Sequence, residues 1–87
     1  MRKMKAVKWI GWRPDEDVCG EAAMMAASGK FFDLVVTPIE RGAVWDVIDG
    51  GDRIASEEAD SVEEAKRKAE TVARRALIRI VKKEGTS

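Results

Sequence analysis

The stretch VWDVIDGGDRIASEEADSVEEAKRKAE, residues 44–70, contains the local signals that decide the fold. Its first residues alternate between apolar and polar, which is typical of a β-strand. Residues 49–52, Asp-Gly-Gly-Asp, follow directly. Because two glycines accept the positive φ angles of a two-residue turn, a second strand is expected over residues 53–58. An amphipathic segment comes next, so the stretch predicts strand, tight turn, strand and helix in that order.

The start of the helix is marked by Ser61 and Glu64, which form a capping-box pattern that satisfies two backbone donors. The apolar residues that follow recur at helical spacing. They are Val62, Ala65, Ala69, Val72, Ala73, Ala76, Leu77 and Ile80. Alanine lets a helix lie close to a sheet that supplies the larger side chains. We therefore predict a helix over residues 62–84, with residues 77–81 reaching beyond the hairpin.

The segments before residue 44 supply further strands and one ambiguity. Residues 30–39, KFFDLVVTPI, are apolar on both faces, which favours a central strand. Residues 5–12 have strand composition, and alternation there places Trp9 and Trp12 on opposite faces. Residues 21–28, EAAMMAAS, have the alanine and methionine content of a helix but could equally pair as a strand. Both readings stay open.

The fold class that follows is α+β: a small antiparallel sheet of three to four strands packed against one long C-terminal helix. A chain of 87 residues is expected to form one domain, residues 1–87. Residues 1–4 and 85–87 are expected to fray at its ends.

Composition limits the function. Sixteen basic and sixteen acidic residues give a net charge of zero, so no global attraction to nucleic acid or membrane is expected. Cys19 is the single cysteine and no histidine is present, which removes an internal disulfide and the commonest catalytic base and metal ligand. Neither a secretory signal nor a membrane span is recognisable. The sequence predicts a cytoplasmic protein that is not an enzyme and holds no metal or cofactor.

One candidate site is an acidic hairpin. Its carboxylates are close together in the sequence, and an exposed Trp12 would add an aromatic anchor of the kind that dominates protein interfaces. The proposed partner-binding residues are Trp12, Asp46, Asp49, Asp52, Glu57 and Glu58. The alternative is that these acids serve the turn and protect an edge strand from pairing with other chains. Their spacing does not match a calcium-binding EF-hand loop.

A second candidate is the basic face of the helix, where four side chains project in similar directions and could bind phosphates. They are Lys68, Arg75, Arg79 and Lys82. The alternative is a solvated face whose charges favour the helix C-terminus. A third hypothesis is a homodimer sealed by the helix end through Leu77, Ile80 and Val81.

The run IASEEADSVEEAKRKAE, at the end of the hairpin, resembles HicB-type antitoxins, in which a polar strand precedes a helix that begins D-S-x-E-E-A. Double-stranded RNA-binding domains share the wider order of strands followed by a helix. The likeness covers residues 31–80 and implies an antitoxin or nucleic-acid-binding module. The HicB DNA-binding extension is missing, however. The glycine-rich loop and the terminal Lys-Lys helix of the RNA-binding domains are not clearly reproduced either.

The whole chain is similar in size and polarity to small orphan proteins of phages and prophages, including anti-CRISPR proteins, which bind and block a larger complex. Our functional expectation is therefore a non-catalytic module that binds a protein partner, with a phage-type inhibitor as one form of it. Nucleic-acid binding by the helix, as in a HicB-like antitoxin, is the alternative.

Overall fold

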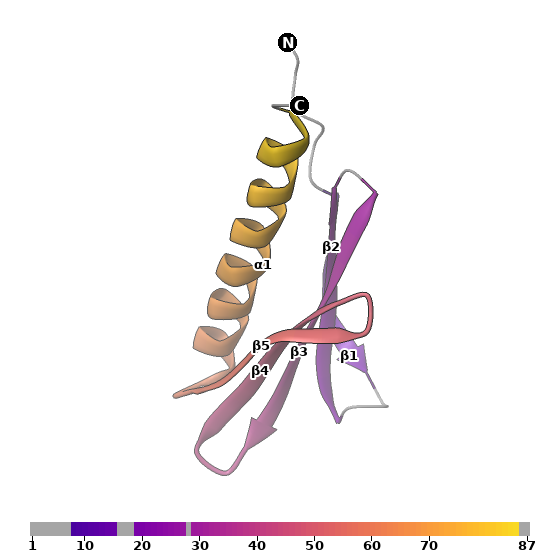
Figure 1. Cartoon of the computed structure of the whole chain (residues 1–87). Helices are drawn as coiled ribbons and strands as arrows, with labels where there is room; N and C mark the ends of the chain where they lie inside the picture. Colours follow the sequence, from indigo (N-terminus) through magenta and orange to yellow (C-terminus); the bar gives the residue numbers. More distant parts are fainter. Residues whose placement is uncertain (1–7, 16–18, 28, 86–87) are drawn as a thin grey trace.

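A computed structural model of the chain describes residues 8–15, 19–27 and 29–85, with side chains described as far as residue 79. Five antiparallel strands form a single sheet in the order β1-β2-β3-β4-β5, and one helix lies across one of its faces (Figure 1). The elements are β1 (Lys8–Asp15), β2 (Gly20–Ala27), β3 (Lys30–Ile39), β4 (Gly42–Asp49), β5 (Asp52–Ala59) and α1 (Val62–Gly85).

The α+β class is confirmed, but the prediction of three to four strands is wrong. The additional strand is β2, which covers most of the ambiguous residues 21–28. It pairs with β1 on one side and β3 on the other, and its buried residues alternate as Ala23, Met25 and Ala27. Pairing on both sides therefore outweighs the helical preference of alanine and methionine, a weak preference that tertiary context overrides.

The hairpin and the helix start agree with the sequence. Asp49 pairs with Asp52, and the two glycines between them have φ angles of 58° and 100°. The backbone N–H of Glu64 donates to Ser61 Oγ at 3.1 Å, as the capping box requires. The returning bond is shifted by one residue, since Glu64 Oε1 accepts from the backbone N–H of Asp60 at 3.0 Å.

The core lies between α1 and one face of the sheet. The helix contributes Ala65, Ala69 and Ala73, each fully buried, together with Leu77. The sheet contributes the larger side chains, as expected for a helix that packs closely through alanine. They include Met25, Phe32, Leu34, Val36, Trp45 and Val47. Because α1 covers only this side, the opposite face of the sheet is left without a covering element among the described residues.

Candidate functional site

The acidic hairpin residues do not gather on one surface. Asp46 and Glu58 lie on the sheet face away from α1, because each neighbours in its strand a residue that packs toward the helix. Glu57 lies on the helix side, opposite Trp45, and lines a hollow with residues of α1. Asp52 is exposed beside the turn. The sheet therefore divides acids that are neighbours in the sequence between its two faces.

Two of these acids are also engaged in ion pairs. Asp46 Oδ1 lies 3.3 Å from Nε of Arg53, and Asp49 Oδ1 lies 3.6 Å from Nζ of Lys30. Such exposed pairs contribute little to stability, but they lower the negative charge that the hairpin presents. The hairpin geometry thus gives weaker support to a single acidic binding surface than the sequence suggested.

Trp12 is not the exposed tryptophan that we expected. Its indole Nε1 donates to Oε2 of Glu70 on α1 at 2.7 Å, and its ring packs against the core. Lys66 Nζ lies 5.7 Å from the centre of this ring and 2.9 Å from Oε1 of Glu21. These contacts attach β1 and β2 to the helix, so Trp12 is a half-buried anchor within the fold.

The predicted placement of Trp9 and Trp12 on opposite faces is wrong as well. The pairing of β1 with β2 shifts between Ile10 and Arg13, where β1 contains one extra residue. This bulge resets the alternation of side chains. Trp9 pairs with the buried Met25, and the two indole rings meet edge to face with their centres 6.2 Å apart. Trp9 is the exposed member, at 42%.

The basic residues of α1 flank β5. Arg75 and Arg79 line a shallow hollow of about 350 Å³ with the exposed Ile54. Lys68 lines the adjoining hollow and lies 3.4 Å from the Glu64 carboxylate, one turn earlier in α1. The remaining member of the predicted set, Lys82, has a side chain outside the described residues. Three of the four predicted cations therefore lie along one side of the helix.

The first of the three residues predicted to form a homodimer contact at the helix end is buried within its own chain. Leu77 is 1% exposed and belongs to the core between α1 and the sheet, so it is not available to a second subunit. It does not overhang the sheet as expected. The other two residues of that predicted contact, Ile80 and Val81, have side chains outside the described residues.

One surface that no described element covers was not singled out by the sequence analysis. We call it the open sheet face, and define it as the residues of β1–β4 that point away from α1. They are Lys8, Ile10, Arg13, Asp15, Ala22, Met24, Ala26, Phe31, Asp33, Val35, Thr37, Ile39, Val44, Asp46 and Ile48. Nine of these fifteen are apolar, and Ile10 and Phe31 are 42% and 47% exposed.

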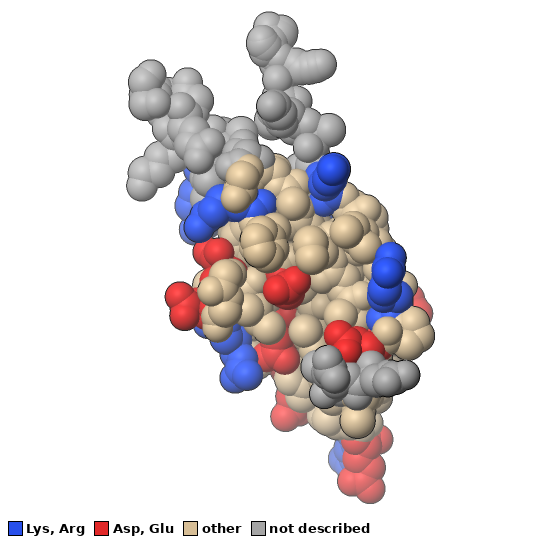
Figure 2. All heavy atoms as spheres, turned by 90° about the vertical axis from the view of Figure 1, so that its right-hand side faces the viewer, with Lys and Arg blue, Asp and Glu red and all other residues tan. Residues whose placement is uncertain are grey.

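Figure 2 shows the molecule from this side, with uncharged residues in tan covering much of the centre and most of the blue Lys and Arg side chains toward the margins. Antiparallel sheets that face water on one side normally carry polar residues there. The open sheet face departs from that pattern, since both faces of β2, β3 and β4 are largely apolar. Extended apolar surfaces of this kind mark interaction sites.

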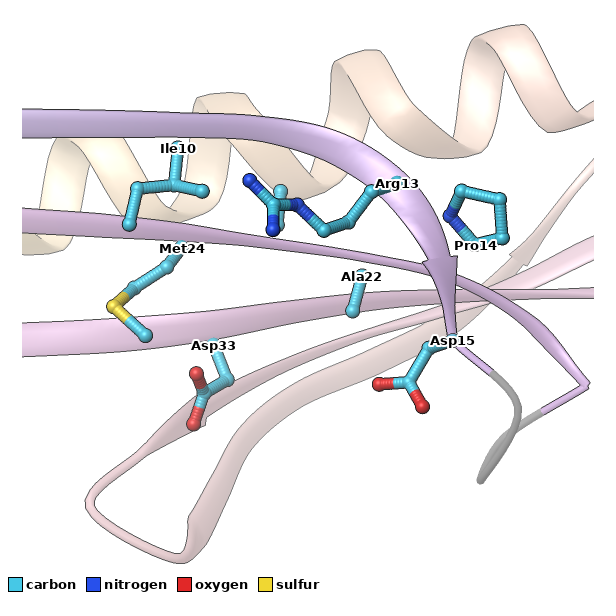
Figure 3. Close-up of a pocket in the computed structure, with 8 residues that line it drawn as sticks. Ile10, Arg13, Pro14, Asp15, Ala22, Met24 and Asp33 are labelled. Carbon is cyan, nitrogen blue, oxygen red and sulfur yellow. The ribbon is translucent and has the colours of Figure 1, made fainter.

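A shallow hollow of about 320 Å³ lies at the β1 side of the open sheet face (Figure 3). Ile10, Ala22 and Met24 supply apolar walls, and Arg13, Asp15 and Asp33 add one cation and two carboxylates. In Figure 3 the Arg13 side chain lies along β1 toward Ile10. The hollow therefore combines an apolar surface with a cation and two carboxylates.

One signal in the sequence could have revealed this face. Residues 30–39 are apolar at both odd and even positions, which indicated a strand covered on both sides. The face becomes continuous only if residues 21–28 are a strand, and that reading was left open.

Among residues 8–15, 19–27 and 29–85, no group of three or more Cys, Asp or Glu side chains is arranged to hold a metal ion. Within the same residues, α1 is not apolar enough over its length to cross a membrane.

No protein-family model, curated protein or solved structure matches this chain. The resemblances to HicB-type antitoxins, double-stranded RNA-binding domains and small phage proteins therefore remain predictions.

Proposed function

We propose that this chain is a non-catalytic module that binds a protein partner through the open sheet face. The observation that supports the proposal is the apolar second face of the sheet. Burial of apolar surface is the main driving force of protein association, and the side chains of this face are held by a hydrogen-bonded sheet. An inhibitor of a larger complex, as the similarity to phage proteins implies, would be one protein of this class.

The experiment compares capture of a partner by the wild type and by a variant of the open sheet face. Val35→Lys places a charge at the centre of the face on β3, where Val35 is half-exposed. We expect the wild-type chain to retain a partner from an extract of its own host cell, and the variant to lose it. Circular dichroism and thermal unfolding would establish that the variant is folded.

Arg74→Glu is the matched control, because Arg74 is exposed on α1 and lies on the other side of the molecule. It changes charge without touching the open sheet face, so it should retain the partner. Retention of the same partner by folded Val35→Lys would mean that binding occurs elsewhere and would contradict the proposal.

Nucleic-acid binding is a second candidate, favoured by the two hollows between α1 and β5. Arg67, Arg75 and Arg79 line them and make no ion pair with any described residue. Phosphate binding should weaken steeply between about 50 and 200 mM salt and should be lost in Arg75→Glu. Fluorescence anisotropy with labelled DNA and RNA tests this, and no binding at low salt would eliminate the candidate.

A further inference from the structure

Three charged side chains of the open sheet face make no hydrogen bond or ion pair with any described residue. They are Lys8 and Arg13 on β1 and Asp33 on β3. Asp33 is only half-exposed and lies between the apolar Met24 and Ile48 of the neighbouring strands. Covering such a carboxylate is costly unless the covering surface brings a cation. A partner for this face must therefore be largely apolar and must bring a cation close to Asp33.

The pairing of the strands arranges the face in rows that run across the sheet from β1 to β4. One row contains Arg13, Ala22, Val35 and Asp46. The next contains Ile10, Met24, Asp33 and Ile48. A further row, Lys8, Ala26 and Phe31, lies beyond the second row. Arg13 lies on β1 and the carboxylates of Asp33 and Asp46 lie on β3 and β4, so one particular arrangement of two copies brings the cation of one copy to the carboxylates of the other.

We infer that the partner on the open sheet face is a second copy of this chain, an inference that rests on the proposed function. The two copies pack face to face about a two-fold axis that runs along the strands, between β2 and β3. This axis places β1 of one copy over β4 of the other, and β2 over β3, while each row stays over its own equivalent. The result is an aligned sandwich with the two sheets about 10 Å apart and a helix on each outer side.

In this arrangement Arg13 and Asp33 each come close to a side chain of opposite charge, while Lys8 and Asp15 remain at the two ends of the edge strand β1. Arg13 lies over the second copy's Asp46, and by symmetry the contact occurs twice. Because the Arg13 side chain lies toward Ile10 and Met24 (Figure 3), and Met24 lies over the second copy's Asp33, the guanidinium falls between the two carboxylates. The half-buried Asp33 thereby obtains a cation that none of the described residues of its own chain supplies.

The apolar residues also match in size. Ala22 lies over the second copy's Val35, and Ala26 over its Phe31, so a small residue faces a larger one in both rows. Ile10 lies over the second copy's Ile48. Alternation of large and small side chains across facing positions is what dense packing requires.

Other axes do not produce this match. An axis along β3 would place Asp33 directly over its own copy and would set two half-buried carboxylates against each other. An axis across the strands would bring Lys8 over Asp15 of the second copy, but it would place Arg13 over Ile10 and leave both Arg13 and Asp33 without an opposite charge. Arg13 and Asp33 therefore select one arrangement.

The area is sufficient for a dimer of moderate affinity. Four strands about 4.8 Å apart and about seven residues long cover roughly 450 Å² of flat sheet on each copy. Because side chains protrude from the sheet, the accessible surface exceeds this flat area, and the two copies together would bury about 1,000 Å². This area is at the lower end of specific interfaces. We expect a dissociation constant in the micromolar range, on the order of 10 µM.

A charge exchange tests the inference. Wild-type protein should sediment as a dimer at about 100 µM in analytical ultracentrifugation. Arg13→Asp and Asp46→Arg each place two like charges against each other at both symmetry-related contacts of the dimer. Each substitution should therefore raise the dissociation constant at least about a hundredfold, and each variant should sediment as a monomer. An equimolar mixture of the two variants should regain the dimer, because each contact of the mixed pair then joins opposite charges.

Arg74→Asp, the same charge change on the exposed side of α1, should remain dimeric. Thermal unfolding checks that Asp46→Arg is folded, since it also loses the ion pair with Arg53. A wild-type monomer at 100 µM, or a mixture that stays monomeric, overturns the inference. If the chain does not dimerise but captures a different protein, and Val35→Lys abolishes that capture, the proposed function holds although the homodimer inference fails. A dimer that tolerates Arg13→Asp places the contact elsewhere and overturns the inference too.

Discussion

The cap of α1 shows how one side chain couples the hairpin to the helix. Glu64 accepts a hydrogen bond from the backbone N–H of Asp60, which ends β5, and it also lies beside Lys68 in the next turn. The hydrogen bond from Asp60, followed by the positive charge of Lys68, lowers the pKa of Glu64 from its ordinary value. Both contacts favour the ionised carboxylate.

The lowered pKa predicts a pH-dependent contribution of Glu64 to stability. A depressed pKa in the folded state stabilises the fold at neutral pH, above the pKa of the unfolded chain, and this stabilisation is lost as the pH falls through the folded value. Glu64→Gln should therefore lower the melting temperature at pH 7 and have little effect below about pH 3.

Glu63→Gln is the control for this prediction, since it removes a charge from the same turn without the hydrogen bond to Asp60. Differential scanning calorimetry of both variants across the pH range gives the comparison. Equal melting-temperature losses for the two variants at pH 7 would show that only the charge near the helix start matters.

Trp12 is the residue that attaches the first strand to the helix, and its indole N–H donates to a carboxylate. Hydrogen bonds to charged groups contribute more than neutral ones, so Trp12→Phe should reduce the free energy of unfolding by about 1–2 kcal/mol. Trp9→Phe removes a similar but more exposed ring and should cost less than about 0.5 kcal/mol. Urea unfolding measures both, and equal losses would contradict the anchoring role of Trp12.

Among the elements, α1 depends most on small side chains. Ala69 is fully buried between the helix and the sheet. Ala69→Leu would force the two layers apart, and overpacking of this kind costs about 1–3 kcal/mol. Ala76→Leu adds the same atoms on the same helix, but at a partly buried position beside a surface hollow. Chemical denaturation should show a clear loss for the first variant and a change within about 0.5 kcal/mol for the second.

The elements that the sequence predicted are those specified by local signals. The two glycines after Asp49 specify the turn, and Ser61 with Glu64 specifies the helix start, whatever the rest of the chain does. Strand β2 has no such signal. Its alanines and methionines suit a helix, and only pairing with the neighbouring strands β1 and β3 on both sides decides in favour of a strand.

The candidate sites were less predictable for the same reason. Asp46 and Glu57 are close in the sequence, but the hairpin places them on opposite faces of the sheet. The bulge in β1, which the isolated Gly11 could have indicated, moved Trp12 to the helix side. The open sheet face exists only once β2 fills the gap between β1 and β3. Surfaces assembled from several strands depend on register, whereas sequence proximity describes only one element.

At the scale of the whole molecule, one helix cannot cover both faces of a five-stranded sheet. The extents of 46 × 21 × 20 Å describe an elongated particle, in which α1 shields one side of the sheet. Most of the Lys and Arg side chains seen from the side of the open sheet face lie toward the margins, and the centre is largely uncharged apart from a few Asp and Glu side chains (Figure 2). The molecule is thus two layers thick, while its apolar pattern would suit a structure with a further layer on the sheet.

If a second copy of the chain supplies this further layer, the thermal stability of the protein should depend on its concentration. If the open sheet face is buried against another copy, dimer formation stabilises the folded chain by mass action, so the melting temperature should rise between about 5 and 500 µM protein. Tryptophan fluorescence can follow the transition, because Trp45 lies in the core on the helix side and reports unfolding rather than association. Arg13→Asp should melt at one temperature at every concentration and match the wild type at high dilution. A wild-type melting temperature that does not change with concentration would mean that the open sheet face stays exposed in the isolated protein.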